Sequence, residues 1–213
     1  MDIILFGMQG SGKGTQGKIL AEKYGLRVFE MGARLRAMIE SGADLGMKIK
    51  ETVEAGHLVD DNTILEVVEA FLKELPQNQQ VLFDGIPRTV YQNERLMELL
   101  KGHGRDAFAL IVKISEEEAI KRLTQRRVCS KCKEVYPAFY KAEECAKCGG
   151  ILITRQDDSN LDSIRQRLEN YEKETKPVLK YFYDLDHLIE VDGEQSIPDV
   201  TEEMIDKAGY LFS

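Results

Sequence analysis

The chain has 213 residues, of which 43% are hydrophobic, so it can bury a substantial core in one α/β domain with insertions or in two small domains. Asp and Glu outnumber Lys and Arg by 37 to 29, and the net charge of −8 works against sequence-independent binding to nucleic acid. No apolar run approaches the roughly 18 residues of a membrane span, and Met1-Asp2-Ile3 lacks the basic start of a signal peptide. A soluble cytoplasmic protein is expected.

The start of the chain predicts a strand, a glycine-rich loop and a helix. An apolar strand at residues 3–6 leads into Gly7-Met8-Gln9-Gly10-Ser11-Gly12-Lys13-Gly14-Thr15, and a helical pattern then runs to Tyr24. Glycines let backbone N–H groups approach phosphate oxygens, the helix N-terminus attracts the same anion, and Lys13 adds a point charge. The motif G-x-x-x-x-G-K-[ST] is met except at its last position, where Gly14 precedes the hydroxyl of Thr15. The competing interpretation is a plain strand-to-helix turn, but the flanking strand and helix favour phosphate binding.

Strand and helix patterns alternate through the rest of the chain. Further strands are predicted at 27–29, 81–83, 109–114 and 187–191. Several short helices are predicted within 31–75, one from about 89, one from the capping box Ser115-Glu116-Glu117-Glu118 to about 127, one from 161 with an interruption near Pro177, and one at 197–211. This alternation predicts a parallel sheet with right-handed crossovers.

Residues 128–158 break the periodicity and hold all four cysteines. Two C-x2-C pairs lie twelve residues apart, close to the spacing of structural zinc ribbons: Cys129, Cys132, Cys145 and Cys148. Four thiolates leave no open position on the ion, so we expect a structural metal that orders this apolar-poor segment. Zinc fits best and iron or cobalt can use the same ligands; two disulfides or four free thiols are the alternatives.

Charged residues near the predicted loop have the chemistry of phosphoryl transfer. Asp84 ends a predicted strand, where open α/β sheets place their ligands, and could hold Mg²⁺ through water. Arg88 follows on a turn fixed by Pro87. The other arginines considered are Arg122 and Arg126, four apart on one helix, and Arg155 and Arg167. Each alone is more often a surface residue, so only their arrangement with the loop supports the prediction.

These residues make the chain resemble adenylate kinases over nearly its whole length, in particular the long form whose lid carries a four-cysteine metal site. The matching segments are Gly7 to Gln16, Leu35-Arg36, Ala55 to Val59, Asp84 to Thr89 with Gln92, Arg126 to Cys129, Thr154-Arg155-x-Asp157-Asp158 and Arg165-x-Arg167-Leu168. The resemblance implies a P-loop NTPase-type fold, with a five-stranded parallel sheet flanked by helices. It divides the chain into a CORE (1–29, 60–124 and 160–213), a helical NMP-binding insert (30–59) and a metal-binding LID (125–159).

The implied reaction is reversible transfer from Mg-ATP to AMP, giving two ADP, in a monomer that needs Mg²⁺ and a structural Zn²⁺. ATP is implied to contact Gly10, Ser11, Gly12, Lys13, Gly14, Thr15, Arg122, Arg126, Val135, Tyr136 and Gln195. AMP is implied to contact Met31, Arg36, His57, Leu58, Val59, Gly85, Ile86, Pro87, Arg88, Gln92, Arg155 and Arg167. The implied catalytic residues are Lys13, Asp84, Arg88, Arg126, Arg155 and Arg167. Both inserts would close to exclude water.

Two departures from the family pattern leave alternatives open. Gln9 replaces the family's proline, and Glu30-Met31-Gly32-Ala33 replaces the usual Ser-Thr-Gly-Asp, which removes a hydroxyl near the acceptor and adds an acid. A kinase of GMP, CMP or UMP is therefore the nearer alternative. A zinc-ribbon nucleic-acid-binding ATPase is an alternative of another class, against which the acidic balance argues. An inactive relative would bind ATP without turnover.

Overall fold

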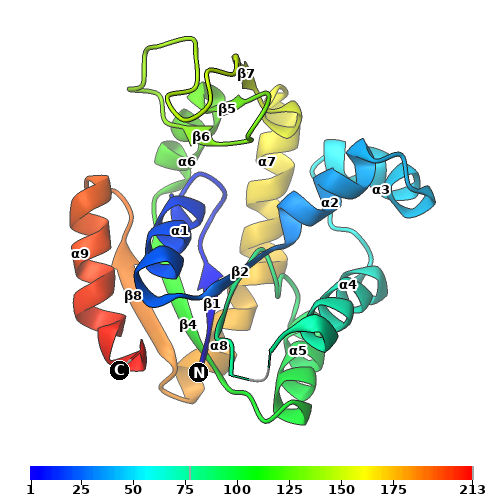
Figure 1. Ribbon diagram of the computed structural model, residues 1–213, viewed down its shortest axis with the longest axis vertical. Coiled ribbons are helices and arrows are strands. Elements are labelled where there is room, and N and C mark those ends of the chain that lie inside the picture. The colour runs from blue at the N-terminus through cyan, green and yellow to red at the C-terminus, as the bar shows by residue number, and fades with distance from the viewer. Residues whose placement is uncertain (77, 213) are drawn as a thin grey trace.

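The protein, described here from a computed structural model, is built around a five-stranded parallel sheet in the order β2-β3-β1-β4-β8 (Figure 1). The structure describes residues 1–76 and 78–212. The strands of this sheet are β1 (Asp2–Phe6), β2 (Arg27–Glu30), β3 (Val81–Asp84), β4 (Ala107–Lys113) and β8 (Leu188–Asp192). All five predicted strands and the parallel arrangement are confirmed; β4 begins two residues before the predicted start at 109.

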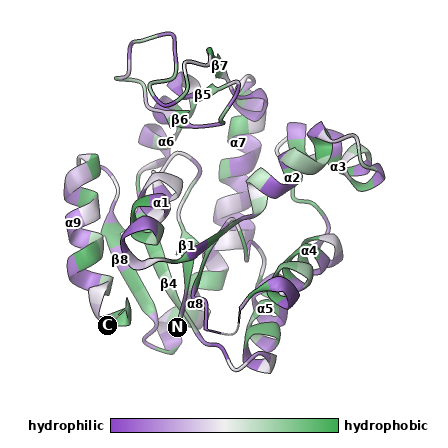
Figure 2. Ribbon diagram, in the orientation of Figure 1, coloured by the Kyte–Doolittle hydropathy of each residue, from purple (hydrophilic) through white to green (hydrophobic). Residues whose placement is uncertain are grey.

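Helices cover both faces of the sheet, and β1 shows why its sequence is continuously apolar. Ile3 and Leu5 pack in a cluster with α1 (Lys13–Tyr24) and α9 (Ile197–Ala208). The alternate residues Ile4 and Phe6 pack in a second cluster on the opposite face, because successive strand side chains point to opposite sides. This second cluster includes residues of α4 (Asp61–Glu74), α5 (Val90–Gly102) and α8 (Leu179–Asp184). Figure 2 shows the apolar sheet between helices whose outer faces are polar.

Capping side chains fix where several helices begin. The Thr89 side chain accepts a hydrogen bond from the N–H of Gln92 at the start of α5. Ser115 caps α6 (Glu116–Gln125) in the same way through the N–H of Glu118. The predicted capping box is only half formed, because the N–H of Ser115 donates to Glu194 at 2.8 Å while Glu118 pairs with neighbouring basic residues of its own helix.

The long C-terminal helical region is interrupted near Pro177, as predicted. It consists of α7 (Leu161–Asn170), a π-helical turn (Tyr171–Thr175), a 3-10 turn (Lys176–Val178) and α8. Proline lacks an N–H and cannot continue an α-helical hydrogen-bond ladder, which explains the break. The last helix, α9, gives way to a 3-10 turn at Gly209–Phe212. No helix within the described ranges is long and apolar enough to cross a bilayer.

Two insertions project beyond the carboxyl ends of the strands (Figure 1). The first is a pair of helices, α2 (Met31–Glu40) and α3 (Asp44–Glu54). They approach closely at Gly46, where a Cβ would lie 2.1 Å from the carbonyl oxygen of Met38. The second, which we call the lid, contains an antiparallel sheet in the order β6-β5-β7. Its strands, not expected from the sequence, are β5 (Arg127–Cys129), β6 (Val135–Tyr136) and β7 (Leu152–Thr154).

Exposed ion pairs connect the lid to both other parts of the molecule. Glu134 accepts from Lys18 of α1 at 3.1 Å. Lys133 donates to Glu40, at the end of α2, at 2.8 Å. Adjacent residues of the lid therefore contact α1 of the main domain and α2 of the helical insertion.

Candidate active site

The loop between β1 and α1 has the backbone of a phosphate-binding site. Gly7, Gly10 and Gly12 have φ angles of 141°, 88° and 91°, which side-chain-bearing residues rarely adopt. A Cβ on Gly7 would also lie 2.5 Å from the carbonyl oxygen of Val112. Gly12 caps α1, so the loop ends at a helix N-terminus, where backbone N–H groups and the helix dipole favour an anion.

Lys13 lies at the start of α1, and its Nζ donates to the carbonyl oxygen of Met8 at 3.3 Å. Burial lowers the pKa of Lys13 to about 8, and Asp84 opposes that shift. Three arginines lower it further: Arg88, Arg126 and Arg167. The predicted loop lysine therefore lies, partly buried, in a positively charged region.

Asp84 and Arg88 lie together at the end of β3. Asp84 is 9% exposed and pairs in register with Leu5 of β1 and Glu30 of β2. Its Oδ2 would lie 3.5 Å from a Cβ on Gly14, so it faces the start of α1. The Nε of Arg88 donates to the carbonyl oxygen of Gly85 at 3.0 Å, and burial lowers the pKa of Arg88 to about 10.

Two buried aspartates hold the remaining predicted arginines. Asp158 accepts from Nε and Nη2 of Arg126 at 2.7 and 2.8 Å and from Nη1 of Arg167 at 2.7 Å. Asp157 accepts from Nη2 of Arg155 at 2.6 Å. Burial would raise the pKa of Asp157, but its arginine neighbours outweigh burial and lower it. Sequence reasoning included these aspartates only as matching residues and did not predict that they orient the arginines.

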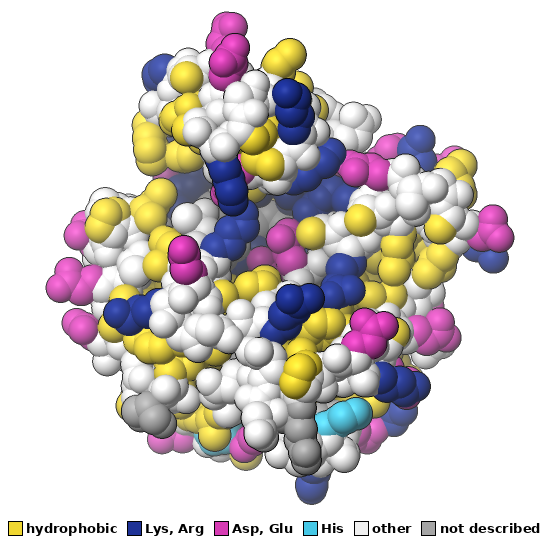
Figure 3. All heavy atoms as spheres, in the orientation of Figure 1, with side chains coloured by type: hydrophobic (Ala, Val, Ile, Leu, Met, Phe, Trp, Pro, Cys, Tyr) yellow, Lys and Arg dark blue, Asp and Glu magenta, His cyan; other side chains and the backbone are white. Residues whose placement is uncertain are grey.

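Cations outnumber carboxylates among these residues, so a ligand carrying several negative charges would be attracted here. Figure 3 shows Lys and Arg side chains gathered in the recess beneath the lid.

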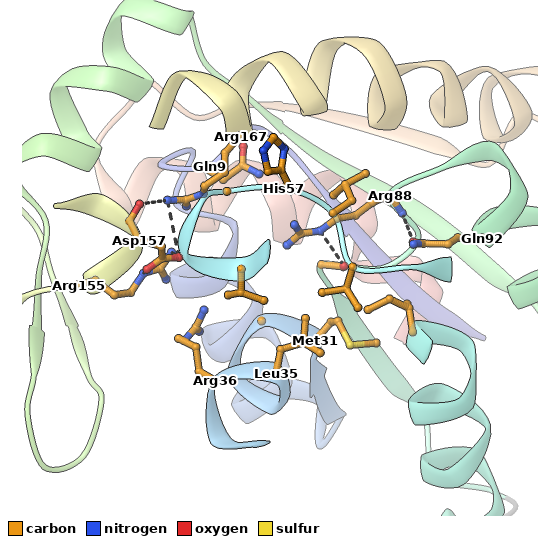
Figure 4. Close-up of a pocket in the computed structure, with 17 residues that line it drawn as sticks. Gln9, Met31, Leu35, Arg36, His57, Arg88, Gln92, Arg155, Asp157 and Arg167 are labelled. Atoms are coloured by element: carbon orange, nitrogen blue, oxygen red, sulfur yellow. Dashed lines mark hydrogen bonds and ion pairs between the residues drawn. The ribbon is translucent and has the colours of Figure 1, made fainter. Parts of the chain in front are cut away.

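A pocket beside this cluster brings together most of the residues that the resemblance assigns to AMP (Figure 4). It is lined by Met31, Arg36, His57, Leu58, Val59, Gly85, Arg88, Gln92, Arg155 and Arg167. Ile86 and Pro87 belong to the same turn as Gly85 but are not among its lining residues. Lining residues that were not predicted as site residues are Gln9, Gly32, Leu35, Val53, Gly56, Ile64 and Asp157. The apolar face of α2 was the sequence signal that could have identified Leu35.

The side-chain amides of Gln92 and Gln9, which both line this pocket, differ in their hydrogen bonding. The Oε1 of Gln92 accepts from the N–H of Arg88 at 2.7 Å, and its Nε2 donates to Asp61 at 2.8 Å, which fixes the amide. Gln9 has a buried Oε1 with no hydrogen-bond partner within the described part of the chain. A ligand donor in the pocket would satisfy that oxygen.

Apart from Arg126, described above, the residues that the resemblance assigns to ATP beyond the loop lie at the loop, after β8 and on the lid. Nη1 of Arg122 is 3.5 Å from the carbonyl oxygen of Ser11, so this arginine lies at the loop. Gln195 is exposed in the turn after β8 and donates to Glu203 at 2.6 Å. Val135 is 40% exposed on the lid. The side chain of Tyr136 instead points into the lid, where its hydroxyl is 3.2 Å from Cys145 Sγ.

The four cysteines of the lid form one cluster. Their Sγ atoms all lie within 4.8 Å of one another, with Cys129–Cys148 at 3.4 Å and Cys132–Cys145 at 3.5 Å. A tetrahedral zinc site with Zn–S bonds of about 2.3 Å places its sulfurs about 3.8 Å apart, so the cluster fits such an ion. The cysteines are not joined by disulfides, which argues against that alternative.

Hydrogen bonds favour the thiolate form of Cys145. Burial opposes ionisation, but the Tyr136 hydroxyl and the N–H groups of Cys148 and Lys147 outweigh it and lower the pKa of Cys145 to about 6. Because a metal binds thiolates, this arrangement suits a ligand.

Removing one thiol should loosen the lid before the rest of the protein. In Cys132→Ser, or with a strong chelator, we expect faster hydrogen exchange in residues 127–154, because an ion is needed to order a segment with so small a core. The exchange of β1 and β4 should remain unchanged. Ser130→Ala, an exposed change in the same turn, is the matched control. An unchanged exchange pattern in both chelator and Cys132→Ser would contradict this expectation.

The parallel sheet, the glycine-rich loop with Lys13 and the adjoining arginine-lined pocket define a P-loop phosphotransferase. The chain belongs to the adenylate kinase family, whose family model matches residues 5–187. It is 37% identical over 210 residues to the adenylate kinase of Acetivibrio thermocellus, covering 96% of each chain. It is 37% identical to that of Archaeoglobus fulgidus over 209 residues (96% of each chain) and 38% identical to that of Kosmotoga olearia over 209 residues (96% of this chain, 97% of the relative). These names favour neither the nucleic-acid-binding ATPase nor a kinase of another nucleoside monophosphate.

Proposed function

We propose that this protein transfers the γ-phosphoryl group of Mg-ATP reversibly to AMP, giving two ADP. The observation that carries the proposal is the position of the arginine-lined pocket next to the phosphate-binding loop, with Arg88, Arg155 and Arg167 among its lining residues. One nucleotide on the loop and another in the pocket would meet between these guanidinium groups.

The donor nucleotide would bind through the loop. Backbone N–H groups of residues 10–15 and Lys13 would hold the ATP phosphates, with Arg122 and Arg126 beside them. Val135, the Tyr136 backbone and Gln195 would border its nucleoside. Asp84 would hold Mg²⁺ through water, and that ion would neutralise charge on the β- and γ-phosphates.

The acceptor would bind in the pocket, with its base against apolar side chains and Gln92. Its phosphate would lie between Arg36 and Arg88. An oxygen of that phosphate would attack the γ-phosphorus as the bond to the β-phosphate oxygen breaks, and ADP would leave from each side. Arg126, Arg155 and Arg167 would stabilise the charge on the transferred group, while closure of the lid would exclude water.

The parts of the molecule would move as three units. We propose a CORE (1–29, 60–124 and 160–213), an NMP-binding insert (30–59) and a LID (125–159). The separate helical pair α2–α3 and the separate lid sheet support these divisions. We further propose a structural Zn²⁺ on the four cysteines and, from the family resemblance, a cytoplasmic monomer that does not bind nucleic acid.

The test is a coupled assay of ADP formation with Mg-ATP and each of AMP, GMP, CMP and UMP, with metal content measured on the same sample. AMP should be the best acceptor and zinc should be present at about one ion per chain. AMP as the worst acceptor would overturn the acceptor assignment. Binding of ATP without turnover of any acceptor would identify an inactive relative, and salt-sensitive retention on single-stranded DNA would support the nucleic-acid alternative.

The lowered pKa of Lys13 predicts a pH dependence of ATP binding. Below about pH 8 the ammonium is charged and attracts phosphate; above it the free enzyme loses that charge, so the Kd for ATP should rise between about pH 7.5 and 9.5. Calorimetric titration with a non-hydrolysable ATP analogue measures this Kd. Lys13→Met should remove the dependence. An equal rise in that variant would assign the titration to another group.

A further inference from the structure

Glu30 is an unexpected carboxylate at the edge of the proposed acceptor pocket. It is the last residue of β2 and directly precedes α2, but its side chain makes no capping hydrogen bond to that helix. Instead its Oε1 lies 3.3 Å from Nη2 of Arg36, six residues further along the chain. Both side chains remain partly exposed, at 40% for Glu30 and 31% for Arg36. The carboxylate therefore contacts a guanidinium rather than stabilising the helix start.

Arg36 lies where it can contact a ligand as well as Glu30. It lines the pocket together with Arg88 and Arg155 (Figure 4). A Cβ on Gly32 would lie 3.1 Å from Nη1 of Arg36, so this glycine makes room for the guanidinium across the first turn of α2. Burial lowers the pKa of Arg36, and Arg155 adds to that effect, while the carboxylates of Asp157 and Glu30 oppose it. An anion reaching Arg36 would relieve this repulsion.

We propose that Glu30 is a positioning residue that weakens binding of the acceptor by competing with its phosphate group for Arg36. This inference deepens the proposed function and depends on it. Carboxylate and phosphate oxygens are both hydrogen-bond acceptors at neutral pH, so neither can donate to the other, and their negative charges repel. The acceptor phosphate must therefore displace Glu30 from Arg36 or bind beside its charge.

We therefore expect Glu30 to weaken the binding of AMP and to leave the binding of ATP unaffected. In Glu30→Gln, which keeps the shape and removes the charge, the Kd and KM for AMP should fall about 2- to 5-fold, an effect expected of one partly exposed charge. The KM for ATP should stay within about twofold, since the contact lies on the acceptor side. The difference between wild type and variant should shrink with added salt, because exposed charges are screened.

A double-mutant cycle tests whether Glu30 acts through Arg36. Glu30→Gln should tighten AMP binding in the wild-type background and have little effect in an Arg36→Ala background. Glu98→Gln is the matched control, because Glu98 is an exposed partner of Arg95 on α5, away from the pocket lining. AMP binding is followed by calorimetry, and KM and kcat are measured for both substrates.

Each outcome decides the proposal. An unchanged AMP Kd in Glu30→Gln would overturn it, and a weaker one would show that Glu30 accepts a hydrogen bond from the nucleoside. Equal tightening with and without Arg36 would overturn the route through that arginine. If wild type forms ADP from ATP and AMP while Glu30→Gln is unchanged, only this inference fails. If wild type neither binds AMP nor forms ADP, the proposed function fails with it.

Discussion

Arg88→Ala is expected to lower kcat by about 10³- to 10⁵-fold, the range over which one arginine can stabilise a phosphoryl-transfer transition state. Arg88 lines the proposed acceptor pocket, and its charge helps to lower the pKa of Lys13. Its Nε donates to the Gly85 carbonyl oxygen, which holds the guanidinium at the pocket lining. Removing it leaves that position without charge, so the loss should fall mainly on kcat rather than on the KM for ATP.

The fold should survive this change, because Arg88 contributes no apolar contact to either sheet cluster. Arg95→Ala is the control, since Arg95 is exposed on α5 and pairs with nearby Glu98. Thermal unfolding should distinguish loss of structure from loss of chemistry. Near wild-type turnover in folded Arg88→Ala would remove this residue from the proposed catalytic group.

Lys13→Met is expected to lower kcat by about 10²- to 10³-fold. This is the loss expected when one preorganised hydrogen-bond donor to the charge that develops in the transition state is removed. Methionine keeps much of the chain length but cannot hold the β- and γ-phosphates. The substitution also removes a desolvated cation surrounded by arginines, so the free protein should be no less stable. ATP binding should weaken as well, in contrast to Arg88→Ala.

Lys23→Met provides the matched change, because Lys23 is an exposed residue in the last turn of the same helix. Single-turnover measurement of ADP formation separates chemistry from nucleotide release. A Lys13→Met enzyme with wild-type single-turnover rates would show that the loop binds phosphate through its backbone alone.

The three central strands of the sheet were predictable because they are buried on both faces. β1 and β3 appear in the sequence as short, continuous apolar runs, and the glycines after β1 mark the turn. The lid sheet was not predictable in the same way. Its strands are two or three residues long, too short to show alternation, and its core consists of cysteines, two tyrosines and a leucine.

The sequence predicted the parts of the site whose backbone geometry requires particular residues, such as glycines. It did not predict which charged side chains would pair with one another. The position of Lys13 was predictable from the loop motif. The positive φ angles of Gly7, Gly10 and Gly12 favour glycine at fixed positions before the lysine. Asp158 pairs with Arg126, 32 residues before it, and with Arg167, nine residues after it, and spacing alone does not specify either partner. The orientation of Tyr136 is a further example. The resemblance assigns this residue to the ATP site, which stays a prediction, but spacing alone did not indicate that its hydroxyl contacts Cys145 Sγ.

The two ion pairs that connect the lid to α1 and α2 come from adjacent residues, Lys133 and Glu134, which directly follow Cys132. A metal ion bound by the cysteines would therefore hold in place the two neighbouring residues that make both ion pairs. Loss of that ion would release the lid from α1 and α2 together while the parallel sheet stays folded, so the proposed activity would depend on the supply of a trace metal.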